Sequence, residues 1–172
     1  NKRRMKNQEM DEMSKSKIEL TPIGHVDTSD GQGPFRLHIE EAYRPALQGL
    51  GSCTHAIVLW WADQAEEGDL VVELPYVPGV KSGVFANRSE SRPNPIAITT
   101  TLVLKVDEDA GTVDLAWIDA FDGTPVLDIK PYMPMSDRVM DAQYPEWLEG
   151  FPESMEDAAA FFSDPENVAK FS

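Results

Sequence analysis

Short stretches rich in β-branched and aromatic residues recur along the chain, and clusters of Gly, Pro and Asp separate them. This pattern is typical of β-strands joined by turns. We expect strands over residues Ile18–Val26, Arg36–Glu40, His55–Ala62, Leu70–Leu74, Ala97–Val106 and Thr112–Ile118. Between the last two, Asp107–Gly111 predicts a hairpin turn, because the downstream Glu and the spacing of a calcium-binding loop are absent.

Helical signals are few and mostly late in the chain. Glu41–Leu47 contains a proline, which limits it to a helical turn. Ser154, with Asp157 three residues later, is a helix-capping pattern, and Asp164-Pro165 predicts a second helix start. Six or more strands followed by about two short helices predict a mainly β fold. We expect an antiparallel β-barrel or sandwich with a small C-terminal helical appendage.

Charge divides the chain into three parts. The net charge is −15, yet residues 1–17 hold six Lys/Arg against three Asp/Glu, and we expect a flexible basic arm or a remnant of recombinant expression. Residues 137–172 hold nine acidic and two basic side chains, which predicts an acidic extension. The barrel domain is assigned to residues 18–136. Only seven basic residues lie in this part, and three of them fall within the two motifs described below.

The single cysteine, Cys53, excludes a disulfide framework and fits a reducing cytosol. The sequence has no apolar run near the roughly 20 residues of a membrane span, and its basic start lacks the apolar stretch of a signal peptide. We therefore expect a soluble, cytoplasmic protein with no membrane partner.

Several common active sites are absent from the sequence. No GxGxxG follows a predicted strand, and neither a GxSxG motif nor a P-loop occurs. The three histidines, His25, His38 and His55, lack metal-ligand spacing, so we expect structural roles and no metal site. Trp60-Trp61 alternates with aliphatic residues, which favours core packing over a base-stacking platform.

The candidate chemistry lies in two motifs, GVFANRSESRPNPIAIT (Gly83–Thr99) and DGTPVLDIKPY (Asp122–Tyr132). In the first, two prolines stiffen a loop that carries Arg88 and Arg92. A stiff loop with guanidinium groups suits planar recognition of a carboxylate or phosphate. The simpler alternative is that these arginines only solvate a surface.

The second motif begins with a tight turn and continues as an extended segment. Asp122-Gly123-Thr124 is either a plain β-turn or a turn whose free backbone groups can hold a purine edge. Asp128, Lys130 and Tyr132 alternate with apolar residues, so they project from one side of a strand. That side is either a functional face or a solvated one.

These motifs resemble the TsaA-like family, the TrmO-like tRNA methyltransferases. Thr21–Gly24 and Leu47–Thr54 add to the resemblance, which covers roughly residues 20–135. It implies a β-barrel methyltransferase unrelated to the Rossmann type. Family members use S-adenosylmethionine to methylate the exocyclic nitrogen of N6-threonylcarbamoyladenosine beside the tRNA anticodon. They form homodimers, with cofactor pockets near the subunit interface.

The resemblance also implies roles for individual residues. Cofactor-binding positions would be Asp63, Gln64, Phe85, Asn87, Arg88, Ser89, Ile98, Phe121, Asp122, Gly123 and Thr124. The candidates for phosphate or for the threonyl carboxylate are Lys81, Arg92 and Lys130, and those for proton removal are Asp128 and Tyr132.

The chain departs from the family in three places. The interval from Asp27 to Arg36 is short and lacks a Pro-Arg-Gln element; Asp63-Gln64 replaces His-Gln, and Arg88-Ser89-Glu90 replaces Arg-Ser-Pro. We expect a methyltransferase acting on modified tRNA. The alternatives are a small-molecule methyltransferase, which the acidic charge favours because RNA binding needs basic groups, and a non-catalytic binder of S-adenosylmethionine or a nucleoside.

Overall fold

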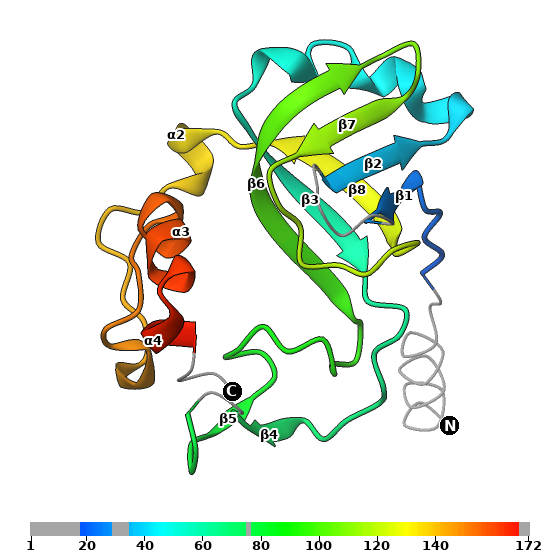
Figure 1. Cartoon of the computed structure of the whole chain (residues 1–172). Coiled ribbons are helices and arrows are strands. Elements are labelled where there is room, and N and C mark those ends of the chain that lie inside the picture. Colours follow the sequence, from blue (N-terminus) through cyan, green and yellow to red (C-terminus); the bar gives the residue numbers. More distant parts are fainter. Residues whose placement is uncertain (1–17, 29–34, 75–76, 169–172) are drawn as a thin grey trace, which may run out of the picture.

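The computed structural model describes residues 18–28, 35–74 and 77–168, and its centre is a closed barrel of six antiparallel strands (Figure 1). The strands, in the order of their pairing, are β1 (Gly24–Asp27), β2 (Phe35–Ile39), β7 (Thr112–Leu115), β6 (Ile96–Asp107), β3 (His55–Trp61) and β8 (Pro125–Pro131). The predicted fold class, a mainly β antiparallel barrel with a C-terminal helical appendage, is confirmed.

Buried and half-buried side chains alternate along β3, and this pattern shows how the sequence fills the barrel. Ala56, Val58 and Trp60 point inward and are buried, whereas the residues between them face outward and are half-buried. The Trp60 indole nitrogen donates to Thr99 Oγ1 at 3.1 Å, so its polar atom is satisfied inside the core. The predicted core role is therefore confirmed for Trp60. It is wrong for Trp61, which alternation turns to the outer face.

Two predicted strands are shorter than the apolar pattern indicates. The first strand begins at Gly24 rather than at Ile18, because Pro22 cannot donate to a ladder. At Gly24 the backbones of β1 and β2 approach so closely that a Cβ would collide with the His38 carbonyl oxygen. The strand predicted to end at Ile118 stops at Leu115.

The predicted hairpin turn between β6 and β7 is confirmed. The Ala110 N–H donates to Asp107 Oδ1 at 3.0 Å, and this bond lowers the pKa of the Asp107 carboxyl. Gly111 adopts a left-handed conformation with φ of 72°. The Arg44 side chain packs against it and donates to the Asp109 carbonyl at 3.1 Å. The acidic run is therefore a structural turn.

Residues 63–95 leave the barrel after β3 and return at β6 (Figure 1). They contain a two-stranded sheet of β4 (Val71–Glu73) and β5 (Lys81–Gly83), and Leu74 and Val84, the residues that follow these strands, are buried. Strand β4 was predicted from its valines. Strand β5 was not, since Lys-Ser-Gly has no β-branched or aromatic residue. This excursion carries most of the first motif.

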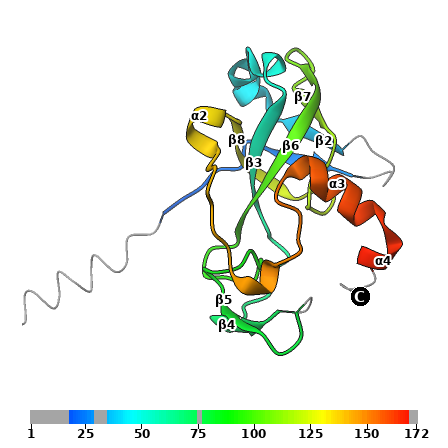
Figure 2. The same ribbon diagram turned by 90° about the vertical axis from the view of Figure 1, so that its left-hand side faces the viewer.

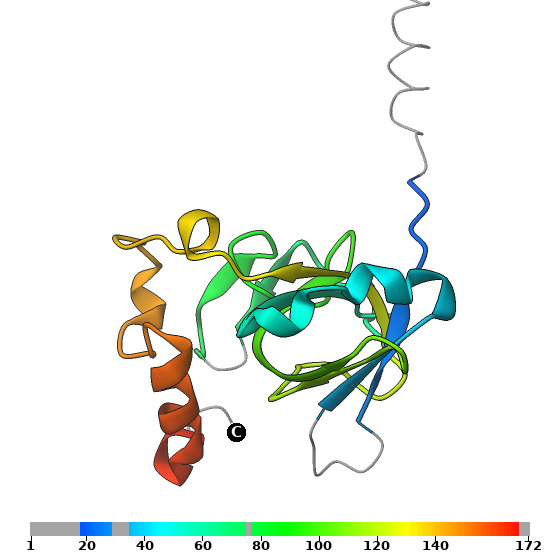
Figure 3. The same ribbon diagram turned by 90° about the horizontal axis from the view of Figure 1, so that it is seen from above.

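The helices lie outside the barrel. The predicted helical turn is the 3-10 helix η1 (Glu41–Leu47), which η2 (Leu50–Ser52) follows. After the barrel come α2 (Pro134–Asp137), η3 (Glu146–Leu148), α3 (Met155–Ser163) and α4 (Pro165–Val168). Ser154 caps α3 as predicted, its Oγ accepting from the Asp157 N–H at 3.1 Å. Figure 3 shows α3 and α4 to one side of the barrel, and in Figure 2, where that side faces the viewer, α3 lies in front of the barrel strands.

The histidines make contacts of structural type. The His25 and His38 rings stack with centroids 5.2 Å apart, and His38 Nε2 lies 3.1 Å from Asp27 Oδ2. His55 contacts Tyr132 edge-on. Within residues 18–28, 35–74 and 77–168, no three His, Cys, Asp or Glu side chains group as metal ligands.

In the same part of the chain, every helix is too short or too polar to cross a membrane.

Candidate functional site

The first motif forms a closed loop between β5 and β6, and Arg92 lies at its centre. Arg92 Nε donates to the Ser89 carbonyl at 2.7 Å, and Nη2 donates to the carbonyls of Val84 at 2.7 Å and Asn87 at 2.8 Å. Asn87 adds a local turn, because its Oδ1 accepts from the Ser89 N–H at 2.9 Å. The stiffness predicted from the prolines is therefore accompanied by side-chain bonds that no local pattern indicates.

Arg88, four residues earlier, has the opposite character. Its side chain is exposed, and within the described residues its guanidinium has no hydrogen-bond or ion-pair partner. An unpaired guanidinium on a closed loop retains its donors for a bidentate anion. Of the two arginines in the motif, Arg88 is thus the one available to a ligand.

An apolar hollow of about 430 Å³ lies against this loop, and Phe85 stands at its rim with 87% of its surface exposed. The hollow is lined by Leu70, Gly83, Val84, Phe85, Ala86 and Pro93. An exposed aromatic ring beside an apolar hollow is typical of a site for a flat, partly apolar ligand.

The Phe121–Thr124 turn is bonded to the end of strand β1. Gly123 has φ of 79°, and the Thr124 N–H donates to the Phe121 carbonyl, which closes a β-turn with glycine at its left-handed position. The Gly123 N–H donates to the Val26 carbonyl at 2.8 Å, and Asp122 Oδ1 accepts from the Thr28 N–H. The N–H groups of Gly123 and Thr124 are therefore occupied, which favours the plain β-turn of the two alternatives for these donors. The cofactor-binding role of Asp122, Gly123 and Thr124 stays a prediction.

Antiparallel pairing brings these separate segments to one end of the barrel (Figure 1). Strand β3 ends where β6 and β8 begin, since Trp61 pairs with Ile96 and Trp60 pairs with Val126. The exposed Asp63 and Gln64 follow β3 directly, and the Ala62 N–H donates to the Pro95 carbonyl at the end of the loop. The first motif, the start of the second motif and the end of β3 therefore lie at the same end of the barrel, and the rest of the second motif extends along β8 away from it.

One cross-strand row extends this region along the outside of the barrel. Leu59 pairs with Ile98 on one side and with Asp128 on the other, so all three side chains point outward. Adjacent strands are ~4.8 Å apart, which places Ile98 and Asp128 about 10 Å from each other. The predicted cofactor residue and the predicted proton acceptor share this face.

Strand β8 presents its polar residues on the same face. Lys130 Nζ lies 2.6 Å from Asp128 Oδ2, and this hydrogen bond raises the pKa of Lys130 above its ordinary value. Asp128 Oδ1 accepts from the Ile129 N–H at 2.9 Å. Tyr132 contacts His55 at the far end of the strand. Lys81 is exposed on β5, opposite Glu73. The roles predicted for these side chains in catalysis or RNA binding stay predictions.

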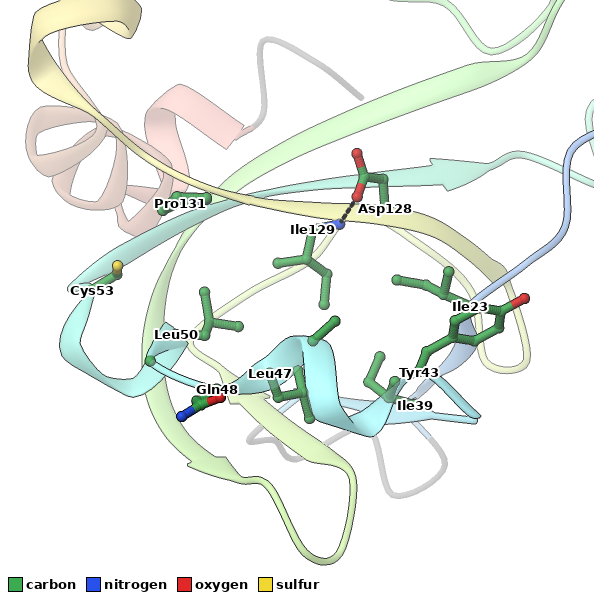
Figure 4. A pocket seen from close by; sticks show the side chains of 12 residues that line it. Ile23, Ile39, Tyr43, Leu47, Gln48, Leu50, Cys53, Asp128, Ile129 and Pro131 are labelled. Carbon is green, nitrogen blue, oxygen red and sulfur yellow. Dashed lines mark hydrogen bonds between the residues drawn. The ribbon is translucent and has the colours of Figure 1, made fainter. Parts of the chain in front are cut away.

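A second hollow, of about 390 Å³, was not predicted from the sequence (Figure 4). It lies between η1, η2 and strand β8, and Leu47, Leu50 and Ile129 form its apolar wall. The Asp128 carboxylate points away from it. Its lining comes from residues that seal the barrel, and only its apolar content is visible in the sequence.

Comparison with known protein families matches residues 14–138 to the tRNA-methyltransferase O N-terminal domain, abbreviated TrmO_N. The chain belongs to the TrmO family. The family resemblance found in the sequence is thereby confirmed. A relative from Archaeoglobus fulgidus, an S-adenosyl-L-methionine-binding protein, is 38% identical over 140 aligned residues, and the match covers 73% of this chain and 99% of the relative.

Two further TrmO relatives bear on the chemistry. The tRNA (adenine(37)-N6)-methyltransferase of Escherichia coli K12 is 36% identical over 126 residues, covering 69% of this chain and 52% of the enzyme. The crystal structure of TrmO from Pseudomonas aeruginosa superimposes with a TM-score of 0.61 at 27% identity, over 90% of this chain and 77% of that one. The relatives include longer proteins, of which this chain spans only 37%.

Proposed function

We propose that this chain is an S-adenosylmethionine-dependent methyltransferase that methylates the exocyclic nitrogen of N6-threonylcarbamoyladenosine in tRNA. The observation that carries the proposal is the convergence of the first motif, the start of the second motif and the end of β3 at one end of the barrel. The names of the relatives agree with the cofactor and enzyme class predicted from the sequence. The threonylcarbamoyl group, the cytoplasmic location and the 18–136 domain boundaries rest on the sequence prediction.

The residues at this end of the barrel fit the cofactor. S-adenosylmethionine has a carboxylate, a flat adenine ring and a sulfonium that supplies the methyl group when bound. Arg88 is exposed and unpaired among the described residues, so it can bind the carboxylate. Phe85 and the adjoining hollow suit the ring, and exposed Asp63 and Asp122 supply negative charge toward a cation.

The chain's own residues have two tasks in the reaction. The first is to hold the acceptor nitrogen in line with the methyl group, which requires no covalent nucleophile. The second is to receive the proton that the nitrogen loses as its bond to the methyl carbon forms. Asp128 stands on the outer face in the row that contains Ile98, and its ion pair with Lys130 fixes the position of the carboxylate. We assign proton removal to Asp128, because Tyr132, the other predicted candidate, lies beside His55 at the far end of β8.

A homodimer is part of the proposal, with a revised interface. The apolar residues of the second motif do not supply the interface, because Val126 is fully buried and Ile129 packs against the core. The outer face of β6 instead exposes Ile98 by 45%, Leu102 by 39% and Leu104 by 52%. An apolar strand face of this kind favours burial against a second copy.

The decisive test is methyl transfer from isotopically labelled S-adenosylmethionine to three acceptors. These are tRNA that carries the threonylcarbamoyl group, the same tRNA without it, and the free modified nucleoside. Incorporation into the first acceptor alone supports the proposal. Incorporation only into the free nucleoside supports a small-molecule methyltransferase, which the net charge of −15 favours. Cofactor binding without any transfer shows a binding protein and overturns the enzymatic assignment.

A further inference from the structure

We propose that Arg92 is a positioning residue, which holds the Gly83–Pro93 loop closed and thereby presents Phe85 and Arg88 to a ligand. The sequence assigned Arg92 to phosphate or carboxylate recognition. The geometry gives it a different task, since two of its three guanidinium nitrogens donate to carbonyl groups of its own loop. The inference rests on the proposed function only in naming S-adenosylmethionine as the ligand.

The three carbonyls that Arg92 binds are spread over the loop. They belong to Val84, Asn87 and Ser89, at 2.7, 2.8 and 2.7 Å, and they precede Arg92 by eight, five and three residues. A planar guanidinium with donors in a fixed fork can bind several carbonyls at once, whereas an ammonium group cannot reproduce that fork. One side chain therefore closes the segment on which Phe85 and Arg88 stand.

The rest of the loop is consistent with this role. Val84 is 2% exposed and its N–H donates to the Leu70 carbonyl, so one end of the loop is anchored. Within the loop, the Ala86 N–H donates to Gly83, and the Ser91 N–H donates to Ser89 Oγ. Within the described residues no carboxylate pairs with Arg92, and its positive charge is met only by carbonyl dipoles.

Arg92 also borders the hollow indirectly. Val84, Phe85 and Ala86 form one wall and Pro93, the residue after Arg92, forms another. Loss of the guanidinium removes the hydrogen bonds that hold the Val84–Ala86 segment next to Pro93, so both sides of the hollow become free to move. We therefore expect substitution of Arg92 to reduce ligand affinity although its side chain does not touch the ligand.

The test compares Arg92→Lys with Arg88→Ala. Backbone hydrogen exchange of the free protein is followed at Ala86, Ser89 and Ser91, whose N–H groups are bonded within the loop. Affinity for S-adenosylmethionine is measured by calorimetry on the same samples. We expect Arg92→Lys to speed exchange at these amides at least about tenfold and to weaken binding by a similar factor, because it frees carbonyls that one fork held. Arg88→Ala should weaken binding and leave loop exchange unchanged.

Barrel amides such as those of Val26 and Val113, both fully buried, report whether a variant is folded. If Arg92→Lys destabilises the whole barrel, Arg92→Gln provides the second variant. Hydrogen exchange of the loop amides that is unchanged in a folded Arg92 variant overturns the proposal. If such a variant also shows a weaker salt dependence of tRNA binding, Arg92 contacts phosphate instead. If the wild type binds no S-adenosylmethionine but loop exchange still rises in Arg92→Lys, the positioning role holds and the proposed function fails.

Discussion

Lys130 Nζ lies 2.6 Å from Asp128 Oδ2 on the outer face of β8. The hydrogen bond raises the pKa of Lys130 above 10.5, so its pairing contributes below that pH and is lost as the pH rises through the raised value. We predict that Asp128→Asn returns the pKa of Lys130 toward 10.5, as measured by NMR titration of the lysine side-chain carbon. Asp107→Asn is the matched control and should leave Lys130 unchanged. Because both partners are exposed, stability should change little.

Arg88 is the side chain on which we expect cofactor binding to depend most. Removal of its charge-assisted hydrogen bonds in Arg88→Ala should weaken S-adenosylmethionine binding by about tenfold or more in calorimetry. Arg88→Lys retains the charge but not the fork, so it should recover only part of the affinity. A folded Arg88→Ala variant with wild-type affinity would remove Arg88 from the site.

The contrast between Arg88 and Arg92 shows what can and cannot be predicted from the local sequence. Both are arginines in one proline-rich loop, and composition assigns both to a ligand equally well. Which guanidinium turns inward depends on where the carbonyls of Val84 and Asn87 come to lie, and that follows from the fold of the whole loop. The strands of the barrel were predictable because alternation of apolar residues is local. The core role predicted for Trp61 is wrong because neighbouring residues of a strand point to opposite faces, so Trp60 and Trp61 cannot both point into the barrel.

Other features were hidden from the sequence for a similar reason. Strand β5 (Lys81–Gly83) is formed by pairing with β4 rather than by residue propensity. The row that joins Ile98 to Asp128 through Leu59 depends on the register of three strands. The basic arm of residues 1–17 and most of the Asp27–Arg36 interval lie outside the described residues, so what the sequence predicts for them stays a prediction.

The dimer proposal predicts a species near twice 19.1 kDa in sedimentation at micromolar concentration. A charge introduced in the middle of the exposed β6 face, Leu102→Asp, should dissociate it, because a buried unpaired carboxylate is unfavourable. Met135→Asp is the matched control, since Met135 is 93% exposed and lies on α2 rather than on β6. A monomeric wild type, or equal effects of the two substitutions, would contradict the proposed interface.

The β6–β7 hairpin offers a stability test with an internal control. Gly111 and Gly79 both have positive φ, of 72° and 82°, but a Cβ at Gly111 would collide with Arg44 whereas none would meet a neighbour at Gly79. Gly79→Ala should therefore lower the free energy of unfolding, measured with urea, only by the penalty for a left-handed backbone at a residue with a Cβ, about 1–2 kcal/mol. Gly111→Ala should cost more, and the additional Arg44→Ala change should recover part of the difference. Equal losses for the two glycines would show that Arg44 moves aside freely.

The acidity of the chain makes its binding of tRNA the most demanding prediction. Residues 18–136 hold seven basic side chains, and Arg36 and Arg92 are engaged with Asp114 and with loop carbonyls. Arg44 and Lys105 are engaged with Asp109 and Asp107, and Arg88 is assigned to the cofactor. We assign phosphate contacts to Lys81 and Lys130, which are exposed, although Lys130 must share its charge with Asp128. Binding should therefore be weak and steep in salt, and Lys81→Ala and Lys130→Ala should each lower the logarithmic salt slope by about one unit. Removal of residues 1–17 should lower it further if the arm reaches RNA. Absence of salt-dependent binding at low ionic strength would leave the small-molecule methyltransferase as the better account.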